Sequence, residues 1–332
     1  SALTMNEVEH LFGILRTLRE RGVTMIYISH RLSELPEICD TVTVLRDGVH
    51  TGSVPIAQAS PAVIMDLMFG EDANTTRSIP CRHSDEVVLE VKNLAVPPRV
   101  TDVSFKLHRG EVLGIAGMLG SGRTEILKAI YGAGSKASGT ITLDGNVITE
   151  TSPFIMKALG MGFTSENRKE DGLVQTLSIR QNLCMAGMQR IAGGFRVRMK
   201  DELKYADANI RDLNIKVPGV ESPVSSLSGG NQQKVVIGNW LNTDPKVILF
   251  DEPSRGVDVH AKQQIFQVIW KQAELGRASI VVSTELDELI EVCDRILVLR
   301  DGRITQELLP EKTSIKELYS ACMEASPSEA CV

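Results

Sequence analysis

The segment GMLGSGRT, residues 117–124, constrains the fold of this 332-residue chain more than any other feature of its sequence. The preceding segment, EVLGIAG (111–117), is apolar as a buried strand would be, and the following one, TEILKAIYG (124–132), reads as a helix. A glycine-rich loop between a strand and a helix turns backbone N–H groups toward phosphate oxygens, and the start of the helix favours negative charge. The arrangement predicts an α/β fold with a phosphate-binding loop, the P-loop.

Arg123 is the one departure of this segment from the pattern G-x-x-x-x-G-K-[ST], which has lysine at that position. Arginine keeps the positive charge and can fork onto phosphate oxygens, but it is bulkier than lysine and is not a neutral exchange. The hydroxyl of Thr124 suits Mg²⁺. The candidate nucleotide ligands of the loop are Gly117, Met118, Leu119, Gly120, Ser121, Gly122, Arg123, Thr124 and Glu125.

A second signal is KVILFDEP (246–253), an apolar strand that ends in two carboxylates. Asp251 at the strand tip can hold Mg²⁺, usually through water, and Glu252 can orient the attacking water and accept its proton. Alone, such a pair is more often a helix N-cap. Its occurrence beside a P-loop in one domain favours Asp251 as a metal ligand and Glu252 as the catalytic residue.

A third signal is LSGGNQQKV (227–235), which opens a helix that carries apolar residues. Bare N–H groups at such an opening suit a terminal phosphate. Ser-Gly-Gly is also an ordinary loop sequence, so the specificity lies in the whole nonamer. The candidate ligands here are Ser228, Gly229, Gly230 and Gln232.

An internal repeat organises the chain. At an offset of 254, residues 11–48 align without a gap with residues 265–302, and both end in VLRDG. Each copy reads as helix, strand, helix, strand, and a closing helix follows each at the same offset. We therefore expect two copies of one domain, the first of them represented only by its C-terminal part. The predicted divisions are 1–70 for the truncated first copy, 71–86 for a polar linker, 87–323 for the complete second copy and 324–332 for a tail.

Composition narrows the classes of function. The net charge of −6 argues against a nucleic-acid binder that relies on bulk attraction to phosphate, and the cluster 196–200 is interpreted as a solvated loop. The six cysteines form no C-x-x-C pair, so neither a zinc site nor a disulfide framework is indicated. Such free thiols fit a reducing cytosol. No apolar run approaches the roughly 18 residues that a membrane span needs.

Together, GMLGSGRT, LSGGNQQKV, ILFDEPSRGVDV and FTSENRKEDGL resemble an ATP-binding cassette (ABC) ATPase. More narrowly, GRT, SENRKEDGL and LSGGNQQK resemble the second cassette of the tandem-cassette ATPases of bacterial ribose, galactose and xylose importers. The resemblance covers the whole chain and implies a P-loop NTPase with a mixed central sheet, an antiparallel β subdomain and a helical subdomain. It also implies ATP and Mg²⁺ as cofactors.

The resemblance implies that cassettes pair head to tail. Each ATP then lies between the P-loop of one cassette and the signature segment of the other, which is LSGGNQQKV in this chain. Ser228 and Gly230 would then serve the first cassette's ATP, as would His30, which matches the family's switch histidine. In the second site the partner of His30 in the repeat is Thr284, and Glu166 stands where most cassettes have glutamine. Glu166 could still ligate Mg²⁺. Since Arg123 also replaces lysine, we expect a second site that binds Mg-ATP and hydrolyses it slowly.

The function expected from the resemblance is that of an energy-coupling ATPase of a sugar importer, at the cytoplasmic face of the membrane. Its partners would be permease subunits, the first cassette of the same chain or a second copy and, indirectly, a periplasmic or lipid-anchored sugar-binding protein. No nucleic-acid partner is expected. Two alternatives stay open, a soluble tandem ABC ATPase and a regulatory nucleotide-binding module without useful chemistry. The sequence does not name the transported sugar.

Overall fold

The computed structural model describes residues 5–28, 35–46, 49–60, 63–64, 67, 83–134, 137–192 and 196–323. The chain divides into two compact units, Ser1–Thr75 with Asp258–His260 and Thr76–Val257 with Ala261–Val332. Each unit is described by itself. Within the described residues, no helix combines the length and the apolar character that a bilayer crossing requires.

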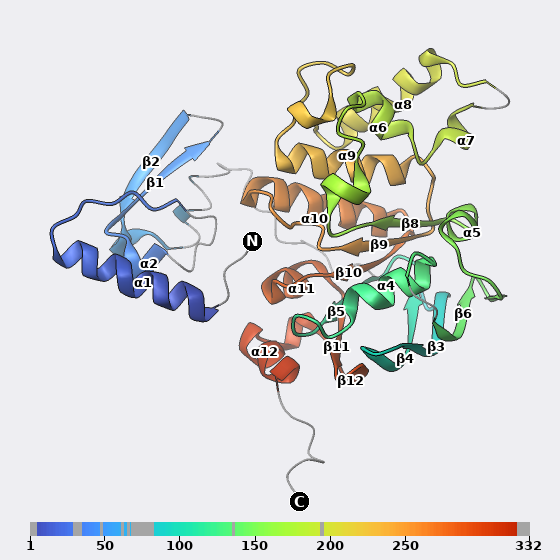
Figure 1. Ribbon diagram of the computed structural model, residues 1–332, viewed down its shortest axis with the longest axis horizontal. Helices are drawn as coiled ribbons and strands as arrows, with labels where there is room; N and C mark the ends of the chain where they lie inside the picture. Colours follow the sequence, from blue (N-terminus) through green and yellow to red (C-terminus); the bar gives the residue numbers. More distant parts are fainter. Residues whose placement is uncertain are drawn as a thin grey trace, which may run out of the picture. The chain divides into compact units, whose positions relative to one another are not determined.

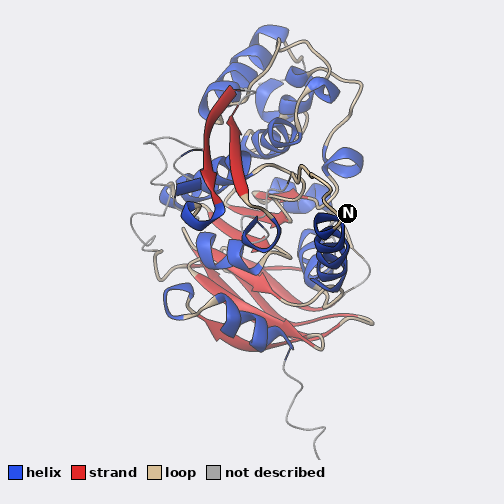
Figure 2. Cartoon of the chain, turned by 90° about the vertical axis from the view of Figure 1, so that its left-hand side faces the viewer, coloured by secondary structure: helices blue, strands red, loops and turns tan. Residues whose placement is uncertain are grey.

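A ten-stranded sheet organises the second unit, with the strand order β7-β6-β3-β4-β12-β11-β5-β10-β9-β8. Its parallel part consists of five neighbouring strands, β5 (Val112–Ala116), β8 (Met161–Thr164), β9 (Val247–Asp251), β10 (Ala278–Val282) and β11 (Arg295–Arg300). β5, β9 and β10 are buried at every position, as expected for parallel strands covered on both faces. Figure 2 shows these strands side by side in red, with helices in blue around them.

Antiparallel pairing extends the sheet on one side. The remaining strands are β3 (Val87–Val96), β4 (Val100–His108), β6 (Ser138–Leu143), β7 (Asn146–Ile148) and β12 (Arg303–Leu308). β3 pairs with β4 and β6, β6 pairs with β7, and β12 pairs with β11, all antiparallel. The turn between β11 and β12 contains Asp301 and Gly302 at φ of 49° and 73°, a left-handed geometry that suits an Asp-Gly turn.

Alternating side chains of the parallel strands enter two hydrophobic cores, one on each face of the sheet. In β5, Val112 and Ala116 belong to one core, and Leu113 and Ile115 belong to the other. The first core contains α9 (Gly229–Leu241), α10 (Val259–Glu274), α11 (Leu286–Val292) and α12 (Ile315–Met323); the second contains α4 (Arg123–Tyr131). This layered packing places the carboxyl ends of β5, β9 and β10 together.

A short helix, α5 (Pro153–Ala158), precedes β8, and a helical group follows it. The elements of this group are the π-helix η4 (Arg168–Gly172), α6 (Ile179–Cys184), α7 (Met188–Ala192), α8 (Met199–Asp212) and the short 3₁₀ helix η5 (Val224–Ser226). α6, α7 and α8 gather beside α9 at the top of Figure 1. Ser178 and Gln181 form a reciprocal capping box that starts α6.

The first unit holds α1 (Met5–Glu20), α2 (Leu35–Ile38), the hairpin strands β1 (Thr41–Arg46) and β2 (Val49–Pro55), and the 3₁₀ helix η2 (Ile56–Gln58). A small core of Leu35, Val42, Val44, Ala59 and Ile64 holds it together. The N–H of Val63 donates to Ser60 Oγ at 3.3 Å, as in a helix N-cap.

The expected fold is confirmed in its main parts. The predicted strand at 111–117 is β5, the predicted helix at 124–132 is α4, and the strand before the paired carboxylates is β9. The mixed sheet, the antiparallel strands and the helical group are all present. Residues 185–187 are not helical and separate α6 from α7. The tail 324–332 and residues 71–82 of the predicted linker lie outside the described residues.

Candidate functional site

The P-loop connects β5 to α4, and steric crowding and backbone conformation explain why two of its positions are glycine. A Cβ at Gly117 would lie 2.6 Å from Ser121 Oγ and 2.7 Å from the carbonyl oxygen of Leu299. Gly122 precedes α4 with φ of 105°, in the left-handed region that favours glycine. The Ser121 N–H donates to the Met118 carbonyl at 3.0 Å, which closes the loop, and Ser121 Oγ is buried without a hydrogen-bond partner. The loop therefore has the tight turn and the free polar atom that an anion could use.

Thr124 and Asp251 join the P-loop to the tip of β9. Thr124 Oγ1 donates to Asp251 Oδ1 at 3.0 Å. The other oxygen, Asp251 Oδ2, is buried without a partner, and the Asp251 side chain is fully buried. Burial raises the pKa of Asp251 to about 6, against the lowering effect of the Thr124 hydrogen bond. A hydroxyl beside an unpaired buried carboxylate oxygen is a donor set that fits Mg²⁺.

Glu252 turns away from the strand with φ of 51°, and its backbone N–H donates to the Val282 carbonyl at 2.9 Å. Its Oε2 accepts two hydrogen bonds from Thr284, one from the backbone N–H at 3.0 Å and one from Oγ1 at 3.1 Å. Burial raises the pKa of this carboxyl, and the bonds from Thr284 and the charge of Arg123 oppose the shift. The structure thus engages one oxygen of Glu252 in two hydrogen bonds with Thr284.

Arg123 is almost completely buried, with 6% of its surface exposed. Its Nη1 donates to the carbonyl oxygen of Ser283, and its Nη2 lies 4.0 Å from Glu252 Oε1. Burial lowers the pKa of the guanidinium, while Glu252 and Asp251 act in the opposite direction. The side chain at the lysine position therefore reaches across to the loop after β10 and faces the carboxylate of Glu252.

The segment LSGGNQQKV opens α9. Ser228 is the N-cap residue, but its side chain makes no capping hydrogen bond to α9. Gly229 is close to the side chain of Arg168, since a Cβ there would lie 2.7 Å from Arg168 Nη2. Gln232 is buried, and its Nε2 donates to the carbonyls of Val224 and Leu227 at 3.3 and 3.2 Å. Ser228, Gly229 and Gly230 thus have the expected bare helix start, whereas Gln232 fastens the segment before it.

Two further candidates form ion pairs. The carboxylate of Glu166 pairs with the Arg255 side chain, rather than with Thr124 or Asp251. Glu125 pairs with Arg99. Arg99 lies beside the P-loop: a Cβ built at Gly122 would be 3.5 Å from Arg99 Cβ. Met118 and Leu119 are exposed at the loop tip. His30 lies outside the described residues.

Sequence reasoning missed the side chains that hold the loop after Glu252. These are Arg168, Ser254, Arg255 and Glu288. The internal repeat could have indicated Glu288, because Ser283 and Glu288 match Ser29 and Glu34 of the first copy at the offset of 254.

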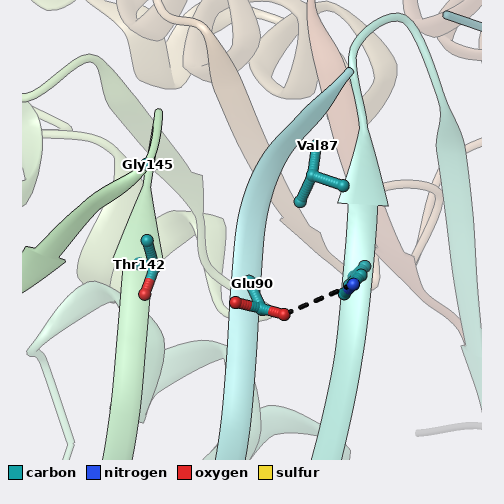
Figure 3. Close-up of a pocket in the computed structure, with 5 residues that line it drawn as sticks. Val87, Glu90, Thr142 and Gly145 are labelled. Carbon is teal, nitrogen blue, oxygen red and sulfur yellow. Dashed lines mark ion pairs between the residues drawn. The ribbon is translucent and has the colours of Figure 1, made fainter. Parts of the chain in front are cut away.

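A separate hollow of about 180 Å³ lies on the antiparallel strands, lined by Val87, Glu90, Lys106, Thr142 and Gly145 (Figure 3). Glu90 pairs there with Lys106 at 3.5 Å and with Lys92 at 2.8 Å. The charged groups are thus paired with each other, and the hollow adds no chemistry to the site. Within the described part of the chain, no cluster of three His, Cys, Asp or Glu residues could form a metal centre.

Residues 100–255 match the family model described as ABC transporter. The chain is 38% identical over 320 residues to the ribose import ATP-binding protein RbsA of Oceanobacillus iheyensis, covering 96% of this chain and 64% of that protein. It is 40% identical over 310 residues to a putative ribose/galactose/methyl galactoside import ATP-binding protein of Burkholderia cenocepacia, covering 93% of this chain and 60% of that protein. The chain thus spans less than two thirds of the length of these curated relatives.

Among solved structures, the fold resembles that of a dimeric ATP-binding cassette in a post-hydrolysis state bound to ADP and phosphate. The TM-score is 0.59 at 22% identity, and the match covers 67% of this chain and 98% of that one. This likeness concerns the fold alone.

Proposed function

We propose, given that this chain contains an ABC transporter ATP-binding domain with the P-loop NTPase fold, that it binds Mg-ATP and couples ATP hydrolysis to import of a monosaccharide. The permease through which the sugar passes would be a separate membrane protein. The names of the relatives support a sugar of the ribose or galactose class as the cargo.

One observation carries the nucleotide part of this proposal. Thr124 Oγ1 and Asp251 Oδ1 are 3.0 Å apart at the mouth of the P-loop, and Asp251 Oδ2 is buried without a partner. A buried carboxylate oxygen without a hydrogen bond is costly, and a ligand that satisfies it explains its presence. Thr124 and Asp251 would hold Mg²⁺, which when bound neutralises phosphate charge. The residues 117–123 would bind the phosphates themselves.

We also propose that the chain belongs to a tandem-cassette protein, in which 1–70 end a first cassette and 87–323 form the second. The repeat at offset 254 supports this organisation, as does the greater length of the relatives. Ser228, Gly229 and Gly230 would then meet the ATP held by the first cassette, together with His30. The protein would act at the cytoplasmic face of the membrane, fed by a sugar-binding protein outside.

The site formed by the P-loop described here would hydrolyse ATP slowly. Glu252 is the candidate base, but Thr284 occupies one of its oxygens and Arg123 faces the other. A general base must reach the attacking water, and these contacts with Thr284 and Arg123 would keep Glu252 from doing so. This arrangement also favours, as a second candidate, a regulatory role for this site in which ATP binding rather than turnover carries the signal.

Calorimetry tests the binding proposal on the full tandem protein. We expect Mg-ATP to bind at two sites, of which the Asp251→Asn variant loses one. Two sites of unchanged affinity in Asp251→Asn would remove the P-loop of 117–124 from the nucleotide chemistry. Uptake of labelled ribose and galactose by cells that carry the protein and its permease tests the transport proposal.

A further inference from the structure

The residues after Glu252 form a short segment, here called the 253–257 loop, which is fastened from two sides. On one side, Ser254 Oγ donates to Glu288 Oε2 at 2.5 Å. On the other side, Arg168 Nη1 donates to the Arg255 carbonyl at 2.6 Å and Nη2 to the Gly256 carbonyl at 3.2 Å. The Glu288 and Arg168 side chains belong to α11 and to η4, which are far apart in sequence.

Glu288 also reaches a second loop. Its Oε2 accepts a hydrogen bond from Ser283 Oγ at 2.7 Å, and its Oε1 lies 3.3 Å from Lys262 Nζ on α10. Ser283 precedes Thr284, whose N–H and hydroxyl hold Glu252. One carboxylate oxygen therefore connects the loop after β9 with the loop after β10, and Glu252 lies between these two attachments.

The position of Glu288 is not explained by core packing. The residue is only 2% exposed, and an ionisable group at such depth opposes folding unless donors satisfy it. A hydrophobic side chain would fill the same space without that penalty. The three donors around Glu288 come from three different segments, namely Ser254, Ser283 and Lys262. A carboxylate gains geometric specificity here because its acceptor directions fix both loops at once.

We propose that Glu288 is a positioning residue for Glu252, and that Arg168 fixes the far end of the same 253–257 loop. This inference rests on the proposed function in one respect, namely that Glu252 activates water at this site. Glu288 itself touches neither the P-loop nor the Thr124–Asp251 pair in any contact described above. Its loss should therefore disturb turnover more than nucleotide affinity.

The test uses the full tandem protein and counts only the part of ATP hydrolysis that Glu252→Gln removes. Glu288→Gln keeps the shape, but its amide NH2, a donor, must face either Lys262 or the two serines, so both loops lose part of their attachment and Glu252 its placement. We expect that rate to fall about 10-fold with KM for ATP changed less than about 2-fold. Ser254→Ala should lower the rate about 5-fold, and Ser254→Thr, which keeps the hydroxyl, should stay within about 2-fold of the parent.

Glu291→Gln is the matched control. Glu291 also lies on α11 and accepts a hydrogen bond from α10, from Gln263 Nε2 at 2.7 Å, but it does not contact either loop in the hydrogen bonds described. We expect its rate and KM to match the parent. Equal losses in Glu291→Gln and Glu288→Gln would reduce Glu288 to a general support of α11 and overturn the inference.

Amide hydrogen exchange decides the placement independently of hydrolysis. In Glu288→Gln we expect exchange to speed up at least about 3-fold at 253–257 and 283–286, with the strands of the sheet unchanged. If the parent shows no hydrolysis that depends on Glu252, the proposed function fails at this site, and exchange alone then judges the positioning role. Unchanged exchange at both loops in Glu288→Gln and Ser254→Ala would overturn it.

Discussion

The two carboxylates at the tip of β9 are adjacent in sequence but differ in their surroundings. Asp251 has one oxygen bonded to Thr124 and one oxygen that is buried without a partner. Glu252 has one oxygen bonded twice by Thr284 and the other facing Arg123. The first group is prepared to receive a ligand, whereas the second is already occupied by the protein. Binding and hydrolysis can therefore be adjusted separately within one site, by changing which neighbours each carboxylate has.

The substitution with the largest expected effect on this contrast is Asp251→Asn. An amide keeps the size and one acceptor but removes the charge that Mg²⁺ needs, so we expect affinity for Mg-ATP at this site to fall about 100-fold. Affinity for ATP in the presence of a chelator should change much less. Calorimetry of the full tandem protein with and without Mg²⁺ measures both values.

Asp212→Asn, on the exposed face of α8, provides the control for Asp251→Asn and should leave both affinities unchanged. An equal loss with and without Mg²⁺ would mean that Asp251 supports the P-loop rather than a metal. The contrast between the two carboxylates would then be one of packing alone.

The pH dependence of stability tests the buried carboxyl of Glu288, which holds the loops on both sides of Glu252. Burial raises the pKa of Glu288 to about 7 from the ordinary 4.5, against the effects of Lys262 and the two serines. Between pH 4.5 and about 7 the folded chain holds a proton that the unfolded chain releases. The contribution of this proton to the free energy of unfolding is therefore complete below pH 4.5 and is lost as the pH rises through about 7. Glu288→Gln cannot ionise. Relative to the parent it should gain on the order of 2–3 kcal/mol between about pH 5 and pH 8.

Thermal unfolding of parent and Glu288→Gln at these two pH values measures the gain. Glu317→Gln serves as a control, since the backbone N–H of Ser314 lowers the pKa of that exposed carboxyl. It should not gain stability at the higher pH. A parallel pH dependence in parent and Glu288→Gln would show that Glu288 is already ionised across this range.

Local sequence determined most of the fold and the binding half of the site. The buried runs of β5 and β9, the glycines of the P-loop and the helix behind them are each encoded within about ten residues, so their meeting at one sheet edge followed from parallel pairing. The start of the helix at LSGGNQQKV was readable for the same reason.

The partners of Glu252 were not readable in this way. The contact between Arg123 and the Ser283 carbonyl joins residues 160 positions apart, and Arg168 reaches Arg255 across 87. Glu166 was predicted as a metal ligand from its position in a motif, but which cation it meets depends on where the 253–257 loop lies. Such choices are made by tertiary packing, which no single stretch of sequence encodes.

Arg123→Lys tests how much the cation that faces Glu252 contributes to the contrast between the two carboxylates. Lysine lacks the fork that reaches the Ser283 carbonyl while it approaches Glu252, so the carboxylate should be less engaged. We expect the hydrolysis that depends on Glu252 to rise about 10-fold, with ATP affinity within about 3-fold of the parent. Steady-state hydrolysis by the full tandem protein, with and without Glu252→Gln, measures the rise.

Arg211→Lys, on the surface of α8, is the control for the same chemical exchange and should leave the rate unchanged. A fall in rate with Arg123→Lys would show that the arginine is the productive cation of this site. Slow turnover would then need another cause than the pairing of Glu252.

Thr284→Val should have the smallest effect. It removes the hydroxyl that donates to Glu252 Oε2 at 3.1 Å but keeps the backbone N–H at 3.0 Å, so the carboxylate loses one of two bonds on that oxygen. One such bond is worth about 0.5–1.5 kcal/mol, and only part of it acts on the basicity of Glu252, so we expect the Glu252-dependent rate to rise about 2–3-fold. Thr284→Ser keeps the donor and should match the parent. If the rate falls in Thr284→Val but not in Thr284→Ser, then Thr284 aims Glu252 at the water rather than withholding it. The contrast between the two carboxylates would then lie in Arg123 alone.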